Sequence, residues 1–298
     1  MDREKRVIAL GFFDGVHLGH GALLKKVAQR AGELGAVPAA FTFDAHPASR
    51  ILGRQIPQLS TPEDRAGLMR RCYGIEDVAV GRFDRMMRMD WRAFVTEYLQ
   101  KELGAVHVVA GHDFHFGYRG EGNPARLQSL CAEIGLGCDI ISKVELDGIT
   151  VSSTYIRTLV AQGETERAME FLGHPHVYTG TVVHGKQLGR AIGFPTANLI
   201  VPEGILVPAH GVYAAKVITP DGAEHMAVTN VGTRPTVDDG DAVTVEPWIL
   251  DFDGDLYGRE IRVEYYKRLR GEKKFSGLEE LTAMVFRNAD QTREYFAE

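Results

Sequence analysis

The stretch from Gly11 to His20 constrains the fold of this chain most. It reads G-F-F-D-G-V-H-L-G-H, follows a short apolar strand predicted at Val7 to Leu10, and opens the first long amphipathic helix. A strand that passes through glycines into a helix start aims unpaired backbone N–H groups and the positive end of the helix dipole at one point. That point suits a phosphate, which His17 and His20, three residues apart, can both reach. The alternative is a glycine-rich turn with two exposed histidines.

The composition is that of a globular chain. A length of 298 residues suits two domains. Hydrophobic residues make up 44% and charged residues 25% of the chain, and no apolar run approaches the roughly 20 residues of a membrane span. The run at Val7 to Leu10 is interrupted too soon for a secretory signal, so we expect a cytoplasmic protein without a membrane partner. Cys72, Cys131 and Cys138 form no C-x-x-C pair, which argues against a disulfide framework and a cysteine zinc site.

The charge balance disfavours nucleic acid as a partner. The formal net charge is −6, whereas a nucleic-acid binder normally carries a basic face or stripe. We therefore expect small-molecule partners and no nucleic acid. The basic residues concentrate in one short run, usually a solvated face, which comprises Lys267, Arg268, Arg270, Lys273 and Lys274.

The first half of the chain alternates short apolar strands with amphipathic helices. This pattern, from Val7 to about Leu172, predicts βαβ units and a parallel sheet. In such sheets ligands bind at the carboxyl ends of the strands. The predicted strands are Val7 to Leu10, Val37 to Phe43, Asp77 to Val80, Val106 to Ala110 and Asp139 to Ile141, and the later helices are Pro62 to Arg71, Trp91 to Leu103 and Pro124 to Ile134.

Two further loops at these strand ends carry polar residues. His46, which follows the second strand, could face the same crevice as the histidines of the first turn or lie on the surface. The run from Gly111 to Gly117 places aromatic and polar residues between glycines, with Arg119 and Asn123 close behind. It suits either a loop that packs on a planar ring or a tight turn with core phenylalanines.

A cluster of hydroxyl residues, Ser152, Ser153 and Thr154, precedes Arg157. The cluster predicts the N-cap of a helix, with Arg157 in its first turn. An arginine there opposes the helix dipole. The conflict indicates that Arg157 is placed for a ligand phosphate, which a guanidinium binds through two parallel hydrogen bonds.

The pattern changes near Gly173 to His176. The following hundred or so residues show short alternating strands with glycine, proline and aspartate turns, which predicts a closed antiparallel barrel. A final amphipathic helix is expected from about Leu278 to Phe296. The predicted barrel strands are Val177 to Val183, Val212 to Ile218, Met226 to Val231, Val243 to Leu250 and Ile261 to Tyr265.

The loop from Gly185 to Asn198 holds the candidate chemistry of this half. The segment from Gly180 to Lys186, which runs into this loop, matches G-x-x-x-x-G-K, but Gln187 replaces the hydroxyl residue that a P-loop requires, so we reject a P-loop. Glycines at four-residue intervals with two cations instead suit an irregular loop against a triphosphate. Thr196 and Asn198 add oxygens on one side of an extended segment, as suits magnesium. An ordinary Pro-Thr turn is the alternative.

Glu246 stands within an otherwise apolar strand. A carboxylate there either faces water or, if it points to the phosphate loop, takes a proton from an attacking hydroxyl. Pro247 follows it directly. Because proline lacks an N–H and is unwelcome inside a strand, we expect an edge or a bulge at this position.

Six segments occur together in one order and carry a resemblance over nearly the whole chain. They are G-F-F-D-G-V-H-L-G-H, G-H-D-F-H-F-G, V-S-S-T-Y-I-R, G-R-A-I-G-F-P-T-A-N, N-V-G-T-R-P-T and L-D-F-D-G-D-L-Y-G. The first is similar to the signature of the nucleotidyltransferase superfamily. Together they resemble the bacterial bifunctional riboflavin kinase/FMN adenylyltransferase (FAD synthetase) family. The chain departs from the usual P-H-P of that family at Ala45-His46-Pro47.

The resemblance implies two domains with two reactions. Residues 1–172 are expected to form a Rossmann-like adenylyltransferase domain, and residues 173–298 a six-stranded riboflavin kinase barrel with a C-terminal helix. The family makes FMN and ADP from riboflavin and ATP, then FAD and pyrophosphate from FMN and a second ATP. The implied cofactor is Mg²⁺, with ATP, riboflavin, FMN and FAD as substrates or products. We expect a monomer or a weak homo-oligomer.

The resemblance also assigns roles to residues. The catalytic residues are Glu246, His17, His20 and Arg157, and the metal ligands are Thr196 and Asn198. The flavin-binding residues are His46, Phe114, Phe116, Asn123, Arg268 and Arg293. The nucleotide-binding residues are Gly11, Phe12, Asp14, Gly19, Gly111, Asp113, Ser152, Ser153, Thr154, Gly185, Lys186, Gly189, Arg190 and Gly193.

Other readings of the chain are an enzyme with only one of the two activities and a non-catalytic flavin or nucleotide sensor. His17, His20 and Arg157 argue against the loss of adenylyltransferase activity. An aminoacyl-tRNA synthetase, which resembles the family at the first motif, is disfavoured by the acidic balance and the absent anticodon-binding region.

Overall fold

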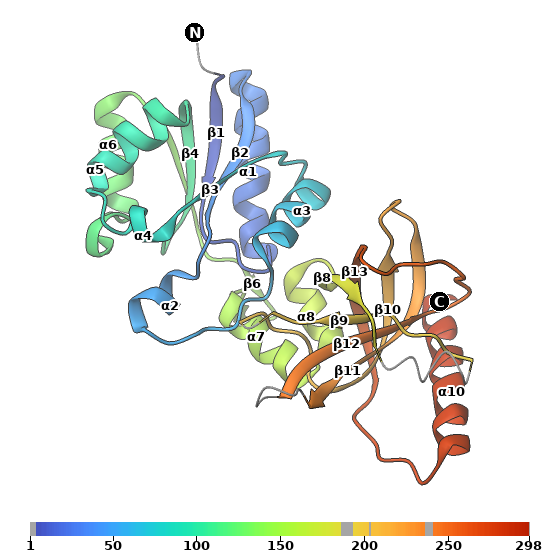
Figure 1. The fold of residues 1–298 in the computed structure, drawn as a ribbon. Coiled ribbons are helices and arrows are strands. Elements are labelled where there is room, and N and C mark those ends of the chain that lie inside the picture. Colours follow the sequence, from blue (N-terminus) through green and yellow to red (C-terminus); the bar gives the residue numbers. More distant parts are fainter. Residues whose placement is uncertain (1–3, 186–192, 203, 236–240, 298) are drawn as a thin grey trace. The chain divides into compact units, whose positions relative to one another are not determined.

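The structure is a computed structural model that describes residues 4–185, 193–202, 204–235 and 241–297. Figure 1 follows the chain from the N-terminus to the C-terminus. The chain forms two compact units, one of residues 1–58 with 62–153 and the other of residues 59–61 with 154–298. The domain boundary expected between residues 172 and 173 stays a prediction.

The first unit is built on a five-stranded sheet in the order β3-β2-β1-β4-β5. All four pairings are parallel, which confirms the prediction of an α/β fold. The order reverses between β1 and β4, and doubly wound sheets bind ligands at the carboxyl ends of the strands beside such a reversal. The strands are β1 (Arg6–Leu10), β2 (Val37–Phe43), β3 (Asp77–Gly81), β4 (Ala105–Gly111) and β5 (Gly137–Ile141).

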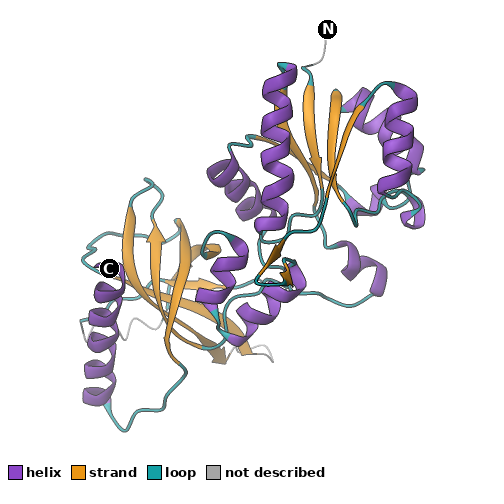
Figure 2. Cartoon of the chain, turned by 180° about the vertical axis from the view of Figure 1, so that it is seen from behind, coloured by secondary structure: helices purple, strands orange, loops and turns teal. Residues whose placement is uncertain are grey.

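Helices cover both faces of this sheet, as Figure 2 shows. Helix α1 (Leu18–Leu34) packs against β1, β2 and β4 and against α3 (Pro62–Tyr73). On the other face, η1 (Phe94–Glu102) and α6 (Pro124–Ile134) share one apolar core with the sheet. The shorter elements of the unit are α2 (Pro47–Leu52), α4 (Phe83–Met86), α5 (Trp91–Ala93), η2 (Tyr118–Gly120), β6 (Glu145–Leu146) and β7 (Ile149–Thr150).

The second unit is a closed barrel in the order β10-β11-β12-β9-β8-β13, antiparallel at every pairing. Buried side chains such as Tyr178, Val245 and Tyr265 fill its interior, and α10 packs outside on β10 and β11. The elements are α7 (Ser153–Gln162), α8 (Thr165–Leu172), β8 (His176–Val183), β9 (Asn198–Ile200), β10 (Gly211–Ile218), β11 (Glu224–Pro235), β12 (Asp241–Ile249), β13 (Glu260–Arg270) and α10 (Leu278–Ala297).

Of the edge or bulge expected at Pro247, the structure has no bulge but does have a local edge. Strand β12 lies between β11 and β9, and its pairing with β11 runs through Pro247 without a register shift. The Pro247 carbonyl accepts a hydrogen bond from the Ala197 N–H at 2.9 Å, so its ring nitrogen also faces that neighbour. Strand β9 begins only at Asn198. The missing N–H of proline therefore falls where the regular pairing ends.

Candidate active sites

The turn after β1 has an unusual backbone. Phe13, Gly15 and Val16 all have positive φ angles, of 58°, 76° and 44°. Glycine adopts such angles readily, but a β-branched valine does so at a cost. All three residues are buried. The surrounding structure therefore holds this turn in a strained conformation, as is common at functional sites.

The turn brings the two predicted histidines together. His17 is the N-cap residue of α1, and its Nδ1 accepts a hydrogen bond from the His20 N–H at 3.2 Å. Nδ1 is thus an acceptor, which leaves the proton of a neutral ring on Nε2. The rings of His17 and His20 are stacked. A methyl group on Gly19 would lie 3.0 Å from the His17 ring, which explains the glycine at that position.

His20 is a neutral group at pH 7. Burial of its imidazole lowers its pKa well below the usual value of 6.5, and His17 and Arg65 lower the pKa further. Its Nδ1 is shielded from solvent and has no hydrogen-bond partner among the described residues. In its neutral form the ring offers a hydrogen bond, and not a positive charge, to a ligand.

Ser153 contacts the same turn. Its Oγ donates a hydrogen bond to the Asp14 carbonyl at 3.0 Å, and the Asp14 side chain is buried. Ser153 of the predicted hydroxyl cluster therefore lies beside the turn of Gly11 to His20, although the two segments are far apart in the sequence.

Arg157 is not in the first turn of its helix, contrary to the prediction. Helix α7 begins at Ser153, so Arg157 is its fifth residue and opens the second turn. Because the helix dipole acts mainly within the first turn, the inferred conflict is weaker than expected. The Nη1 of Arg157 lies 3.4 Å from Thr154 Oγ1.

His46 lies against the first turn. It is the N-cap residue of α2, with its Nδ1 accepting from the Ala48 N–H at 3.1 Å. Its ring meets the ring of Phe12 edge-on at 4.8 Å. The structure thus brings the loop after β2 to the turn after β1, as one of the two sequence alternatives required.

The loop after β4 contains both residues that are accessible to a ligand and residues that belong to the core. Phe114 is partly buried and stacks on Phe116, which is only 5% exposed and belongs to the core. Phe116 thus fits the alternative of a tight turn with core phenylalanines, and its contact with a flavin stays a prediction. Asp113 is exposed. Asn123 caps α6 by accepting a hydrogen bond from the Arg126 N–H at 3.0 Å.

Arg65 is a buried residue beside the first turn that the motifs did not indicate. This residue of α3 is fully buried, and its guanidinium lies over the Phe12 ring with 4.1 Å from Cζ to the ring centroid. Because the helix is rich in charged residues, its composition does not indicate that one of its arginines is buried. A signal was available in the spacing, since Arg65 lies on the helical face of the buried residues Leu68 and Met69.

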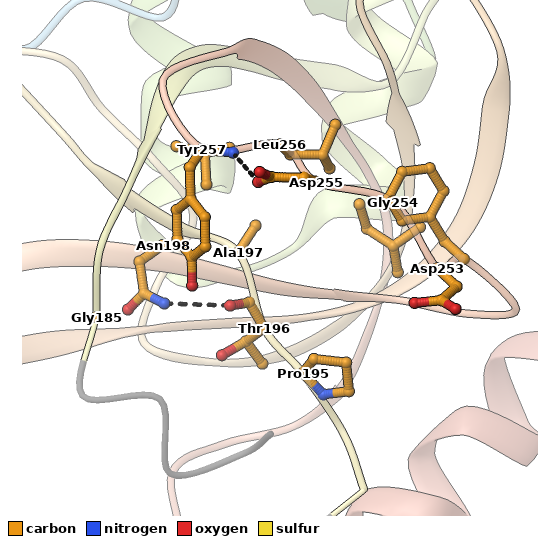
Figure 3. Close-up of a pocket in the computed structure, with 13 residues that line it drawn as sticks. Gly185, Pro195, Thr196, Ala197, Asn198, Asp253, Gly254, Asp255, Leu256 and Tyr257 are labelled. Atoms are coloured by element: carbon orange, nitrogen blue, oxygen red, sulfur yellow. Dashed lines mark hydrogen bonds between the residues drawn. The ribbon is translucent and has the colours of Figure 1, made fainter. Parts of the chain in front are cut away.

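The second unit contains a cavity of about 350 Å³ between the loop that enters β9 and the loop that follows β12. Figure 3 shows Thr196 and Asn198 on one side and the segment from Asp253 to Tyr257 on the other. The Asn198 Nδ2 donates to the Thr196 carbonyl at 3.3 Å, and Gly185 lies against the Asn198 side chain. A Cβ on Gly185 would come within 2.6 Å of that amide.

Glu246 lies opposite Asn198, one of the residues that line this cavity. The pairs Val245↔Leu199 and Thr196↔Trp248 share one register, which places Glu246 opposite Asn198. Residues opposite one another on neighbouring strands, and those two positions apart, point to the same side of a sheet. Thr196, Asn198 and Glu246 therefore form a row of polar side chains on one face. Thr244 Oγ1, from the same face, donates to Glu246 Oε1 at 3.3 Å.

Besides Gly185, four of the predicted nucleotide residues belong to the loop before β9. Lys186, Gly189 and Arg190 lie outside the described residues. Gly193 is exposed and has a φ of 90°.

The predicted flavin residues of the barrel unit already have protein partners. Arg268 donates to the carbonyls of Gln162, at 3.2 Å, and His210, at 2.8 Å. Arg293, on α10, forms a salt bridge with Asp251, with 2.9 Å between Nη2 and Oδ1. Their contacts with a flavin stay predictions.

Hard oxygen donors fit Mg²⁺ at the row of Thr196 and Asn198. The Asn198 Nδ2 donates to the Thr196 carbonyl, so the Oδ1 of the same amide points away from that carbonyl. In the part of the chain that the structure describes, no group of three or more His, Cys, Asp or Glu side chains could hold a metal ion. Mg²⁺ in nucleotide sites commonly uses few protein ligands together with phosphates.

No helix in the part of the chain that the structure describes is long and apolar enough to cross a membrane.

Fold and sites define a two-part transferase, with a nucleotidyltransferase-type sheet followed by a flavokinase-type barrel. Comparison with known proteins agrees for each part. Residues 1–155 match the FAD synthetase family, and residues 172–296 match the riboflavin kinase family.

Relatives match the chain over nearly its full length. The bifunctional riboflavin kinase/FMN adenylyltransferase of Listeria monocytogenes is 40% identical, over 98% of this chain and 93% of its own. That of Bacillus subtilis is 36% identical, over 99% and 94%. A crystal structure of a macrolide-efflux protein from Streptococcus pneumoniae superimposes with a TM-score of 0.83 and 29% identity, over 97% of this chain and 94% of that one. The chain belongs to the bifunctional riboflavin kinase/FMN adenylyltransferase family, as its motifs predicted.

Proposed function

We propose that this chain makes FAD in two steps at two sites. In the barrel unit, riboflavin and ATP give FMN and ADP. In the α/β unit, FMN and a second ATP give FAD and pyrophosphate. The observation that carries the proposal is the presence on one chain of the His17/His20 turn after β1 and of the row formed by Thr196, Asn198 and Glu246.

The adenylyl transfer needs alignment more than acid-base chemistry. A phosphate oxygen of FMN attacks the α-phosphorus of ATP, and the bond to the β-phosphate breaks with loss of pyrophosphate. The nucleophile is already ionised, so no protein base is required. His17 and His20 donate hydrogen bonds to the phosphates, and Arg157 offsets their charge. Asp113 and Phe114 serve the nucleotide and flavin, with His46 beside the turn.

The phosphorylation of riboflavin does need a base. The 5′-hydroxyl attacks the γ-phosphorus of ATP, ADP leaves, and Glu246 takes the hydroxyl proton. Thr196 and Asn198 hold Mg²⁺, which offsets the charge of the phosphates when bound. Gly185 lets the phosphate loop approach the Asn198 side chain. We propose a cytoplasmic location and a monomer or weak homo-oligomer for the enzyme.

The test is chromatography of the purified protein incubated with riboflavin, ATP and Mg²⁺. We expect FMN first and FAD later, and no product when EDTA replaces Mg²⁺. FMN without FAD would restrict the function to the barrel unit. Bound riboflavin without any product would favour a flavin sensor instead.

A further inference from the structure

Arg65 is a buried cation held by neutral groups. Its Nη1 donates to Thr42 Oγ1 at 3.0 Å and to the Phe43 carbonyl at 3.2 Å, and its Nη2 donates to Gln58 Oε1 at 3.2 Å. Burial lowers its pKa to about 10, with Asp14 and Glu63 opposing the shift, so the group stays charged at pH 7. Burying a charge is costly, and a residue that only filled space would not need one.

Two routes connect Arg65 with Phe12. The guanidinium covers the Phe12 ring at 4.1 Å, a cation–π contact. Thr42 Oγ1, which accepts from Arg65, donates in turn to the Phe12 carbonyl at 2.8 Å. The ring and the backbone of Phe12 are therefore both held, and His46 contacts the edge of the same ring.

Phe12 stands immediately before the strained part of the turn. Phe13 and Val16 follow with positive φ angles, and His17 caps the next helix. A conformation of this kind persists only where its surroundings over-determine it. The contacts of Phe12 fix the chain before the turn, and the N-cap of α1 fixes the chain after it.

Arg65 offers no exposed group to the substrate phosphates. Its exposed fraction is 0%, and its two terminal nitrogens donate to the protein. The geometry points to a different role, which rests on the proposed function: we propose that Arg65 is a positioning residue for FMN adenylylation. It fixes Phe12 and so holds the turn that carries His17 and His20.

The test measures kcat and KM for FMN adenylylation in four variants. Arg65→Met removes the charge and the hydrogen bonds but keeps much of the side-chain length. Arg65→Lys keeps the charge without the planar fork. Thr42→Val removes the hydroxyl that links Arg65 to the Phe12 carbonyl, and it leaves the cation–π contact with the Phe12 ring in place. Arg70→Met is the matched control, because Arg70 lies on the same helix but is exposed and paired with Glu76. Riboflavin phosphorylation by the same preparations reports the integrity of the chain.

We expect Arg65→Met to lower kcat about tenfold or more, with KM for FMN and ATP changed by less than about threefold. Arg65→Lys should regain part of the loss, and Thr42→Val should lower kcat by a smaller factor. Arg70→Met should behave as wild type, and riboflavin phosphorylation should persist throughout.

Three results would overturn the role of Arg65. One is an unchanged kcat in Arg65→Met, and another is a rise in KM alone, which would indicate direct substrate contact. If Arg65→Met does not fold, Thr42→Val decides: a lower kcat supports the proposal, and a wild-type kcat refutes it. Wild-type protein that makes no FAD from FMN would instead refute the proposed function, and the role of Arg65 with it.

Discussion

The imidazole rings of His17 and His20 lie parallel, with their centroids 3.6 Å apart and 12° between their planes. Two positive charges at this distance would repel strongly, and the low pKa of His20 removes one of them. In the proposed mechanism the pair therefore acts through directed hydrogen bonds. On this account a cationic residue elsewhere, Arg157, has to balance the charge of the transferring phosphate.

The histidine pair and Arg157 should be separable from kinase chemistry. We expect His20→Ala to slow FMN adenylylation about tenfold or more, and His20→Ala with Arg157→Ala to slow it by about 10²–10³, because each change removes a group that stabilises developing charge. Riboflavin phosphorylation should stay normal. Arg92→Ala is the control, since Arg92 is exposed and paired with Glu133. An unchanged FAD yield in the double variant would exclude these residues from the mechanism.

The close approach of Gly185 to Asn198 predicts a specific steric effect. Gly185→Ala should displace the Asn198 amide, since the new methyl would lie 2.6 Å from it. We expect about a tenfold loss of riboflavin phosphorylation or more, with FMN adenylylation unaffected. Gly277→Ala is the matched control because no atom lies within 4 Å of the position of its Cβ. Equal kinase rates in the two variants would contradict the account.

His176 should make the barrel unit sensitive to acid. Its side chain is 2% exposed, and burial lowers its pKa from 6.5 to about 4. The unfolded chain therefore binds a proton first as the pH falls, so stability is complete above about pH 6.5 and declines toward pH 4. Up to about 3 kcal/mol is lost in that interval.

Urea unfolding followed by Trp248 fluorescence measures this effect when Trp91 is replaced by Phe. In His176→Gln the free energy of unfolding should be lower at pH 7 but less dependent on pH. Parallel pH profiles for the two proteins would show that His176 does not titrate in the predicted way.

The sequence predicted the architecture well because its signals were strong. Short apolar strands that alternate with amphipathic helices indicated the parallel sheet, and the change of pattern near Gly173 indicated the barrel. The six motifs indicated the family that the comparisons confirmed. The contact of His46 with Phe12 agrees with one of the two alternatives that the sequence left open, the one favoured where ligand sites gather at the carboxyl ends of parallel strands.

Other features depend on tertiary packing, which a local pattern does not contain. Strand β9 has only three residues, too few for an alternation to be recognised. The core position of Phe116 and the burial of Arg65 are set by segments remote in sequence. Pro247 was expected at an edge or a bulge, and which of the two it is depends on β9, whose pairing ends at that point.

FAD and FMN formation by Glu246→Gln tests the two-site account most directly. With riboflavin as substrate, FMN formation should fall by at least about 10²-fold, because the amide cannot accept the hydroxyl proton. With FMN as substrate, FAD should form at the wild-type rate. Glu224→Gln, at a barrel carboxylate paired with Lys216, should keep both activities. Normal phosphorylation of riboflavin by Glu246→Gln, or loss of FAD formation from FMN, would contradict the account.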